Sequence, residues 1–430
     1  MFDKKYKNTL AQYLNIDDIS ALEPIVGEEE FKYYISRLSE KDFCSKEKSL
    51  FCANLHVHTN YSDGQASVSE ILECALELTE NNLKKDLPFI LSITDHDTIE
   101  GVKEAVRIIS ENPEKYRRLK FVPGVEISAV ETDMPELCGT LDVHSLVYSI
   151  NPFDEKLNKF LDDKRAKKFR LAEITLNSLN RELFSVLDML NISLTLEEAA
   201  KIHPMILKGE DEISHPLKKY IFGKLLFAYY VENNETVLNI LKKYNVDTLN
   251  LSYEKVVHKF KSMFNNERYY YIYKDALEKY LSFLTDGKEI FVLDPIPDFM
   301  ESALLHGKAV CEAAHPSRGV IQEAFTSFRD CAVLALNLEY GLMSIAHPAR
   351  LNLKYVQGDI FSFYKNFFAL FKRYGSESAF GYEKFYQSYS GKKTTAILPD
   401  IDRAADLYDL QHTGGIDSHG KSVCTRFSYY

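Results

Sequence analysis

The sequence predicts an α/β protein built on a parallel sheet or barrel. Two short apolar segments, FCANLHVH (51–58) and PFILSITDHD (88–97), have strand character, and each precedes a stretch with helical periodicity. LKFVPGVEIS (119–128) and LDVHSLVYS (141–149) repeat the strand pattern. Polar residues gather at the ends of these predicted strands, which is where chemistry collects in parallel α/β folds.

The first fifty residues differ from the segments that follow. They are polar and helix-like, and Pro24 and Gly27 interrupt the pattern, so we expect an N-terminal helical extension over residues 1–50. The first part of the α/β domain then covers residues 51–153. Within it, Ser67 or Ser69 can cap the helix that follows the first strand.

The middle of the chain has another pattern. From Asp154 to about Arg181 the sequence predicts one long helix that carries a basic stripe, formed by Lys164, Arg165, Lys167, Lys168 and Arg170. The residues after it are rich in Tyr, Lys and Asn with mostly helical periodicity. We therefore expect a helical insertion, or lid, over residues 154–289. The α/β pattern resumes near EIFVLD and fills residues 290–430.

Composition limits the classes of function. The chain has 430 residues, 45% hydrophobic and 27% charged, which is typical of a globular protein. A net charge of -11 argues against binding along extended duplex nucleic acid. The opening MFDKKYKNTLAQYL is charged and does not resemble a signal peptide, and we expect no membrane-spanning stretch. The seven cysteines are scattered without a CxxC pair. These features predict a cytoplasmic protein.

Nine side chains of metal-ligating type form the candidate set, and five of them, His56, His58, His96, Glu126 and His144, lie near predicted strand ends. The full set is His56, His58, Asp63, His96, Glu126, His144, His347, Asp417 and His419. Six imidazoles and three carboxylates suit Zn, Mn or Fe better than a thiolate site or an all-oxygen Ca site. Residues two apart on a strand point to the same face, so His56 and His58 can reach one metal. Asp417 and His419 have the same spacing and could serve two neighbouring metals.

Six motifs occur in a family-like order: HVHTNYSDG, TDHDTIEG, PGVEIS, HSLVYS, AHPAR and GGIDSHG. This set resembles the PHP family, named for polymerase and histidinol phosphatase. The resemblance covers about residues 51–152 and 290–422, and it implies a distorted (βα)7 barrel that hydrolyses phosphate esters with two or three divalent metal ions. The SDG form of the first motif resembles the branch of nucleotide phosphatases and 5′ exonucleases, which also carries a helical insertion.

The resemblance also implies how the ligands are shared. It assigns a first metal to His56, His58, Glu126 and Asp417. Glu126 would bridge to a second metal held by His144 and His347. A third metal would be held by Asp63, His96 and His419. A second AHP sequence places His315 as an alternative to His347, which we prefer because GLMSIAHPAR has the family's preceding glycine and apolar strand.

Other residues have predicted roles in the reaction. Arg350, beside His347, suits binding of the nonbridging phosphate oxygens through its bidentate guanidinium. Asp97, or another acid near the ligands, could protonate the leaving oxygen. Asp95 and Asp97 flank His96, and for both we weigh helix capping or orientation of a neighbour equally against direct metal ligation. Lys167 and Arg170 of the basic stripe could contact a further substrate phosphate, but such stripes are more often solvated helix faces.

The predicted substrate is a phosphorylated small molecule, preferably a nucleotide, or the 5′ end of a short nucleic acid. Two alternatives stay open. One is a small-metabolite phosphatase, for which histidinol phosphate is the obvious substrate. The other is a non-catalytic, metal-stabilised accessory module that acts through a partner protein.

Overall fold

A computed structural model describes most of the chain outside its middle third. The described residues are 3–44, 52–81, 88–131, 133–137, 141–182, 195–202, 326–351, 353, 356–386 and 392–420, together with the single positions 243, 282, 287 and 288. The chain divides into two compact units, one formed by Met1–Arg165 with Phe325–Tyr430 and the other by Ala166–Ala324. The predicted domain limits at 153/154 and 289/290 stay predictions, and the strand expected at EIFVLD lies outside the described residues.

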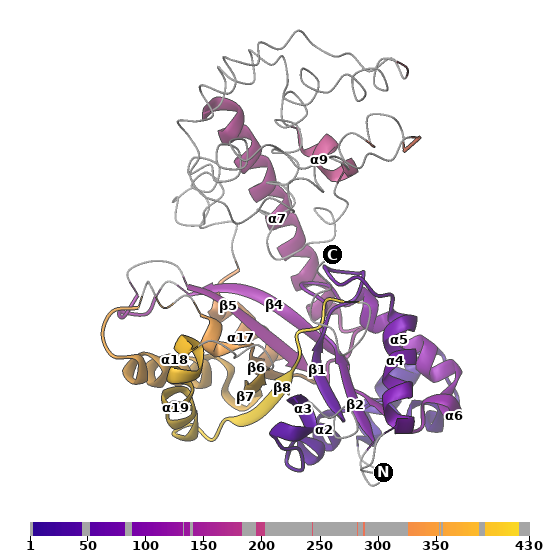
Figure 1. Ribbon diagram of the computed structural model, residues 1–430. Helices are drawn as coiled ribbons and strands as arrows, with labels where there is room; N and C mark the ends of the chain where they lie inside the picture. Colours follow the sequence, from indigo (N-terminus) through magenta and orange to yellow (C-terminus); the bar gives the residue numbers. More distant parts are fainter. Residues whose placement is uncertain are drawn as a thin grey trace. The chain divides into compact units, whose positions relative to one another are not determined.

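A three-stranded parallel sheet forms the first part of the larger unit. Its strands are β1 (Ala53–Val57), β2 (Phe89–Ile93) and β3 (Leu119–Phe121), in that spatial order. Every residue of these strands is buried, including the polar residues Asn54, His56, Ser92 and Lys120. The connecting helices α4 (Val68–Asn81), α5 (Glu100–Glu111) and α6 (Pro113–Tyr116) lie beside them (Figure 1).

A five-stranded mixed sheet forms the second part. Its spatial order is the chain order, β4 (Gly124–Glu131), β5 (Leu141–Tyr148), β6 (Leu342–Ile345), β7 (Ala379–Tyr386) and β8 (Gln411–Gly415).

The expected all-parallel pattern is wrong at β5. This strand runs antiparallel to both β4 and β6, whereas β6, β7 and β8 are parallel. Only residues 132–140 separate β4 from β5, and a parallel crossover needs about a dozen residues or more. Glu126 and His144 lie within β4 and β5, not after the ends of parallel strands.

Isolated bridges connect the two sheets. Val57 pairs with Ser418, and His96 pairs with Glu126, both in parallel orientation. The N–H of His58 donates to the Ser418 carbonyl at 2.9 Å, and the Ser418 N–H donates to the His56 carbonyl at 3.1 Å. These contacts bring the segment after β8 against β1, and β4 against the segment after β2.

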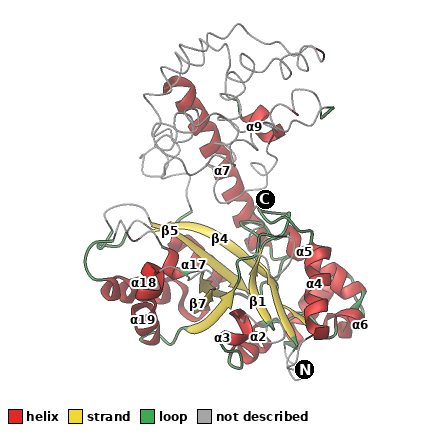
Figure 2. Ribbon diagram, in the orientation of Figure 1, coloured by secondary structure: helices red, strands yellow, loops and turns green. Residues whose placement is uncertain are grey.

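Helices cover the second sheet. They are α17 (Phe328–Asn337), α18 (Ile360–Gly375) and α19 (Lys392–Asp406), with the short turns η4 (Pro348–Arg350) and η6 (Ser376–Ser378). Figure 2 shows helices and strands of this unit in separate colours. Aromatic residues of α18, including Phe363, Phe367 and Phe371, are buried in one apolar cluster with Ile127, Val143 and other sheet residues.

The N-terminal segment folds as part of the larger unit. It forms α1 (Lys4–Leu14), η1 (Ile19–Leu22), α2 (Glu28–Ile35) and α3 (Glu40–Cys44). Asp3 caps α2, because its carboxylate accepts the N–H groups of Glu29 at 3.1 Å and Glu30 at 3.0 Å. Apolar residues of this segment share a core cluster with β1 and β5.

The predicted long helix is confirmed as α7 (Glu155–Glu182). Asp154 caps its N-terminus, because its carboxylate accepts the N–H groups of Lys156 and Leu157. Farther along lies α9 (Leu196–Ile202). None of the described helices combines the length and the apolar composition needed to span a bilayer.

Candidate metal centre

The structure brings the nine predicted ligands together within the larger unit. They come from β1, β4 and β5 and from the segments that follow β1, β2, β6 and β8. Eight of them form three overlapping groups, and within each group the candidate ligand atoms lie within 4.8 Å of one another. The ninth, His347, lies 3.6 Å from Glu126 outside these groups. The groups are His58, Asp63, His96 and His419; His56, His58 and Asp417; and His96, Glu126 and His144.

Glu126 is the central carboxylate of the cluster. Its Oε2 lies 2.9 Å from His56 Nε2 and 3.2 Å from both His58 Nε2 and His96 Nδ1. Its Oε1 lies 3.0 Å from His144 Nδ1 and 3.6 Å from His347 Nε2. The side chain is fully buried. Each oxygen therefore faces a different set of imidazoles, which is the geometry that a ligand shared between two ions requires.

Asp417 joins His56 and His58 from the segment after β8. Its Oδ1 lies 3.5 Å from His56 Nε2 and 3.3 Å from His58 Nε2. The backbone of Asp417 has a φ of 57°, a left-handed conformation that non-glycine residues seldom adopt. Strained backbone of this kind persists where surrounding contacts fix it, and it is common at functional sites.

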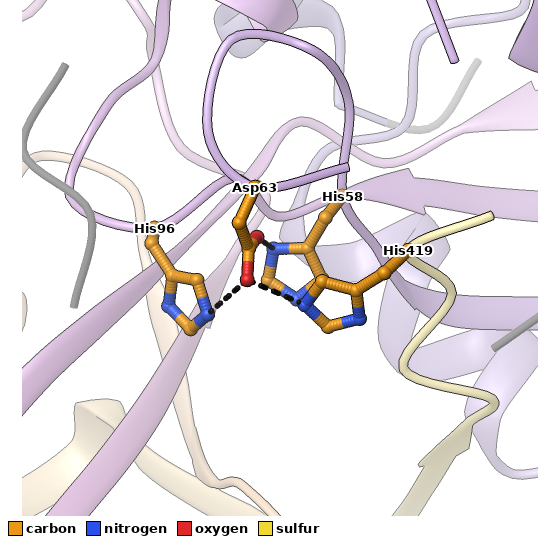
Figure 3. Close-up of side chains that lie close together, drawn as sticks. All are labelled: His58, Asp63, His96 and His419. Carbon is orange, nitrogen blue, oxygen red and sulfur yellow. Dashed lines mark ion pairs between the residues drawn. The ribbon is translucent and has the colours of Figure 1, made fainter. Parts of the chain in front are cut away.

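Asp63 lies among three imidazoles (Figure 3). Its carboxylate oxygens are 2.9 Å from His419 Nε2, 3.5 Å from His58 Nδ1 and 3.8 Å from His96 Nε2. The turn that presents it requires glycine at position 64, because a Cβ there would lie 2.2 Å from the His58 carbonyl oxygen.

Asp95 supports the turn that carries Asp63 through hydrogen bonds with Thr59 and Ser62. Its carboxylate accepts the Thr59 N–H at 2.7 Å, the Thr59 hydroxyl at 2.8 Å and the Ser62 hydroxyl at 2.7 Å. Burial raises the pKa of Asp95, although these hydrogen bonds oppose the shift. We conclude that Asp95 orients the loop that carries Asp63.

His144 and His347 face the other oxygen of Glu126. His144 pairs across the sheet with Ser128, two residues beyond Glu126 on β4. His347 follows β6 with a φ of 28° and is 13% exposed at its side chain. The structure thus places His347 at the cluster, whereas His315 lies outside the described residues.

Mutual attraction dominates the electrostatics of the cluster. Burial alone would raise the pKa values of Glu126 and Asp417, but the neighbouring imidazoles, His56 first, hold both well below their usual range. Burial lowers the pKa of His56, yet the carboxylates of Glu126, Glu383 and Asp417 raise it well above its usual value. In His347, burial prevails and lowers the pKa.

The donor set fits divalent cations. Both ring nitrogens of His58 are buried without a hydrogen-bond partner, although carboxylate oxygens lie 3.2–3.5 Å away. Nδ1 of His347 is likewise buried without a hydrogen bond. Buried polar atoms are normally satisfied, so orphaned nitrogens beside carboxylates indicate a missing partner with positive charge. Imidazole and carboxylate donors suit first-row metals such as Zn, Mn or Fe.

Two residues of β7 adjoin the cluster and were missed from the sequence. Glu383 accepts from His56 Nδ1, and the Tyr386 hydroxyl donates to Asp417 Oδ2 at 2.5 Å. The segment FGYEKFY has no strand-end polar motif. A charged glutamate inside an aromatic strand is the one signal that could have indicated Glu383.

The other predicted site residues have different positions. Arg350 lies at the edge of the cluster, where its Nη1 is 2.6 Å from the Tyr386 hydroxyl and 3.5 Å from Asp417 Oδ2. Asp97 belongs to none of the candidate ligand groups among the described residues. Its carboxylate accepts from the backbone and hydroxyl of Ser128, both at 3.2 Å, and pairs with Lys164 at 3.0 Å.

This geometry favours a role for Asp97 in orienting its neighbour His96 over a role as catalytic acid, because the hydrogen bonds of Asp97 attach this segment to Ser128 of β4. Lys164, one residue of the basic stripe, is buried at this ion pair and is not solvated. Lys167 and Arg170 are exposed on α7 in the other unit, so their contact with substrate stays a prediction.

Comparisons with known proteins give distant structural similarity. No protein-family model and no curated protein matches the chain. An amidohydrolase from Chromobacterium violaceum, solved with sulfate and without metal, aligns with a TM-score of 0.43 and 19% identity, over 86% of this chain and 88% of that one.

A proposed metal-dependent phosphoesterase from Bifidobacterium adolescentis aligns with a TM-score of 0.42 and 15% identity, again over 86% of this chain and 88% of its own. At this level of similarity, neither structure assigns a function to this chain. The histidine-rich clusters of candidate ligands are the stronger observation.

Proposed function

We propose that this protein is a metal-dependent phosphoesterase. The observation that supports it best is the position of Glu126, whose two oxygens face two different sets of imidazoles inside one buried cluster. The order of the sequence motifs, which resembles the PHP family, agrees with this reaction. His56, His58, Glu126 and Asp417 would hold one ion, His144 and His347 with Glu126 a second, and Asp63, His96 and His419 a third.

Divalent ions held by these residues would supply an activated water for attack at phosphorus and positive charge for the phosphate oxygens. The chain's own residues then bind and orient the ester. The Arg350 guanidinium is 45% exposed, so it can bind nonbridging oxygens while the Tyr386 hydroxyl holds one of its nitrogens. The short hydrogen bond from Tyr386 keeps Asp417 in position.

We also propose that the two sheets together form the distorted seven-stranded barrel that the motifs imply. The Val57–Ser418 and His96–Glu126 bridges support this arrangement, since each joins one sheet to the other. β3 and β4, separated by Val122 and Pro123, would count as one bent strand.

We propose a phosphorylated nucleotide, or the 5′ end of a short nucleic acid, as the substrate, and the cytoplasm as the location. The SDG form of the first motif supports the nucleotide-like class. A phosphate on a small metabolite such as histidinol is the second candidate, which the same cluster could serve.

The assay uses full-length protein, treated with chelator and reloaded with Mn²⁺ or Zn²⁺. Substrates are nucleotide bisphosphates, short 5′-phosphorylated oligonucleotides and histidinol phosphate. We expect metal-dependent phosphate release that is fastest with the nucleotide-like esters. Turnover of histidinol phosphate alone would support the small-metabolite alternative. Metal binding without turnover of any ester would favour the non-catalytic module.

Glu126→Gln is the decisive variant. The amide keeps the shape but replaces one acceptor oxygen by a donor group that faces imidazoles, and we expect kcat/KM to fall by more than about 100-fold. Asp42→Asn is a matched control, because Asp42 is also a buried carboxylate, bound to Ser39 and Cys52 and outside the ligand groups. Equal loss in both variants would point to damage of the fold and not to loss of a ligand.

A further inference from the structure

Glu383 is a buried carboxylate on β7 that contacts two predicted ligands. Its Oε1 and Oε2 lie 3.1 and 3.3 Å from His56 Nδ1. Oε2 also accepts the backbone N–H of His347 at 2.9 Å. The side chain of Glu383 is fully buried, as is that of His56. A carboxylate removed from water in this way is costly unless its partners are fixed and complementary.

The contact with Glu383 distinguishes the two nitrogens of His56. Nε2 faces the cluster, 2.9 Å from Glu126 Oε2 and 3.5 Å from Asp417 Oδ1. Nδ1 faces Glu383 and therefore keeps its hydrogen, since a carboxylate accepts but cannot donate. With Nδ1 protonated, the lone pair of a neutral ring is on Nε2, which is the atom directed at the other ligands.

The contact with His347 acts through the backbone. The φ of this residue is 28°, which is unfavourable for a side chain larger than glycine. The N–H of His347 donates to Glu383 while the residue stands between β6 and η4. Glu383 thereby supports the turn that directs His347 toward Glu126 Oε1.

We propose that Glu383 is a positioning residue of the candidate metal centre, which fixes the tautomer of His56 and the backbone of His347. It thereby supports two predicted metal positions from one strand, although it is not itself a ligand. This inference rests on the proposed function, because it assumes that the cluster binds divalent ions. Carboxylates that accept from the second nitrogen of a metal-bound histidine typically change metal affinity about 10–100-fold when they are removed.

The test is Zn²⁺ binding to chelator-treated full-length protein, measured by isothermal titration calorimetry for wild type and Glu383→Gln. Glutamine keeps one acceptor oxygen and replaces the other by an NH2 group, so a donor would face either the His56 Nδ1–H or the His347 N–H. We expect Zn²⁺ affinity to fall about 10–100-fold. Because Glu383 supports two positions, we also expect the number of tightly bound ions to fall, as measured by metal analysis after dialysis.

Asp42→Asn is again the control, since it removes a carboxylate of similar burial that belongs to none of the ligand groups. It should keep the affinity and the number of bound ions of the wild type. Wild-type affinity and stoichiometry in Glu383→Gln would overturn the positioning role and leave the proposed function intact. Absence of both Zn²⁺ and Mn²⁺ binding by the wild type would overturn both proposals.

A measurement on the wild type covers the case in which Glu383→Gln does not fold. In Zn²⁺-loaded protein labelled with ¹⁵N-histidine, NMR correlations through the ring carbons assign each nitrogen of His56. We expect a protonated Nδ1 and an ion-bound Nε2. An ion-bound or unprotonated Nδ1 would overturn the proposal.

Discussion

At the residue scale, the two oxygens of Asp417 have different neighbours. Oδ1 faces His56 and His58, whereas Oδ2 accepts from the Tyr386 hydroxyl and lies near Arg350. Tyr386 is buried and also contacts Arg350 through its oxygen. One hydroxyl thus connects a candidate ligand with the residue proposed to bind phosphate.

Removing that hydroxyl tests the connection. In Tyr386→Phe, the charged carboxylate of Asp417 loses the hydrogen bond that the Tyr386 hydroxyl donates. A hydrogen bond to a charged group contributes about 1.5–3 kcal/mol. We expect kcat/KM for the phosphate ester to fall about tenfold or more. Tyr382→Phe is the matched control, because Tyr382 lies on the same strand and donates to Asp402 of α19 at 2.6 Å. Similar kinetics in both variants would contradict the role of Tyr386.

The pKa of His58 predicts how metal binding depends on pH. Burial and the His96 ring lower this pKa, but Asp63, Asp417 and Glu126 outweigh them and raise it to about 9. Below that pH the ring of the metal-free protein is protonated, so an ion must displace the proton. Affinity should therefore rise with pH between 6 and 8, by up to about tenfold per unit from this group.

Calorimetry with Zn²⁺ in two buffers of different ionisation enthalpy measures the protons released. The expected result is release of at least one proton per protein at pH 7. Binding without proton release, or affinity that falls as pH rises, would show that His58 is neutral before the ion binds.

At the scale of elements, the approach of β8 to β1 brings Asp417 and His419 to His56 and His58. Gly415 makes it possible, because a Cβ at this position would lie 2.5 Å from His56 Cβ and 2.9 Å from His56 N. The next residues of the chain reach Asp417 and His419. A side chain at 415 would therefore push two ligands away from His56.

Gly415→Ala and Gly414→Ala form a matched pair. A Cβ at 414 would lie 2.6 Å from the Phe385 carbonyl oxygen and 2.7 Å from Phe385 Cβ, away from the ligands. We expect both variants to lose about 1–3 kcal/mol of stability through overpacking. Only Gly415→Ala should also lose Zn²⁺ affinity. Chemical unfolding measures the stability of the two variants, and calorimetry their Zn²⁺ affinity. Equal Zn²⁺ affinities of Gly415→Ala and Gly414→Ala would contradict the role of Gly415.

At the scale of the whole molecule, the candidate ligands come from positions far apart in the chain, between His56 and His419, and lie together in one cluster. An ion bound there stabilises the folded chain, because the unfolded chain cannot present these ligands together. At a free concentration of about 100 Kd the stabilisation is about 2.7 kcal/mol. Chelator should lower the Tm, and Zn²⁺ or Mn²⁺ should restore it.

Differential scanning fluorimetry measures this shift. Glu126→Gln is the informative companion, since its Tm should respond much less to added metal. A Tm that is unchanged by chelator and metal in the wild type would contradict a buried metal centre.

The sequence by itself determined the ligand types and their order. The HxH pair at the end of β1, the SDG turn, the histidine after β2 and the DSH segment after β8 are local patterns, so they can be found without knowing what lies opposite them. The positions of β1, β2 and α7 also follow from local apolar periodicity.

Only the tertiary structure decided how these residues meet. The antiparallel direction of β5, the division of Glu126 between two sets of imidazoles, and Glu383 behind His56 depend on register between strands remote in sequence. Asp97 has a ligand's sequence context, yet its carboxylate pairs with Lys164 of a distant helix. Such contacts arise from packing across the sheets. The neighbours of a residue in the chain determine which face of a strand or helix its side chain is on, but not which distant residue it contacts there.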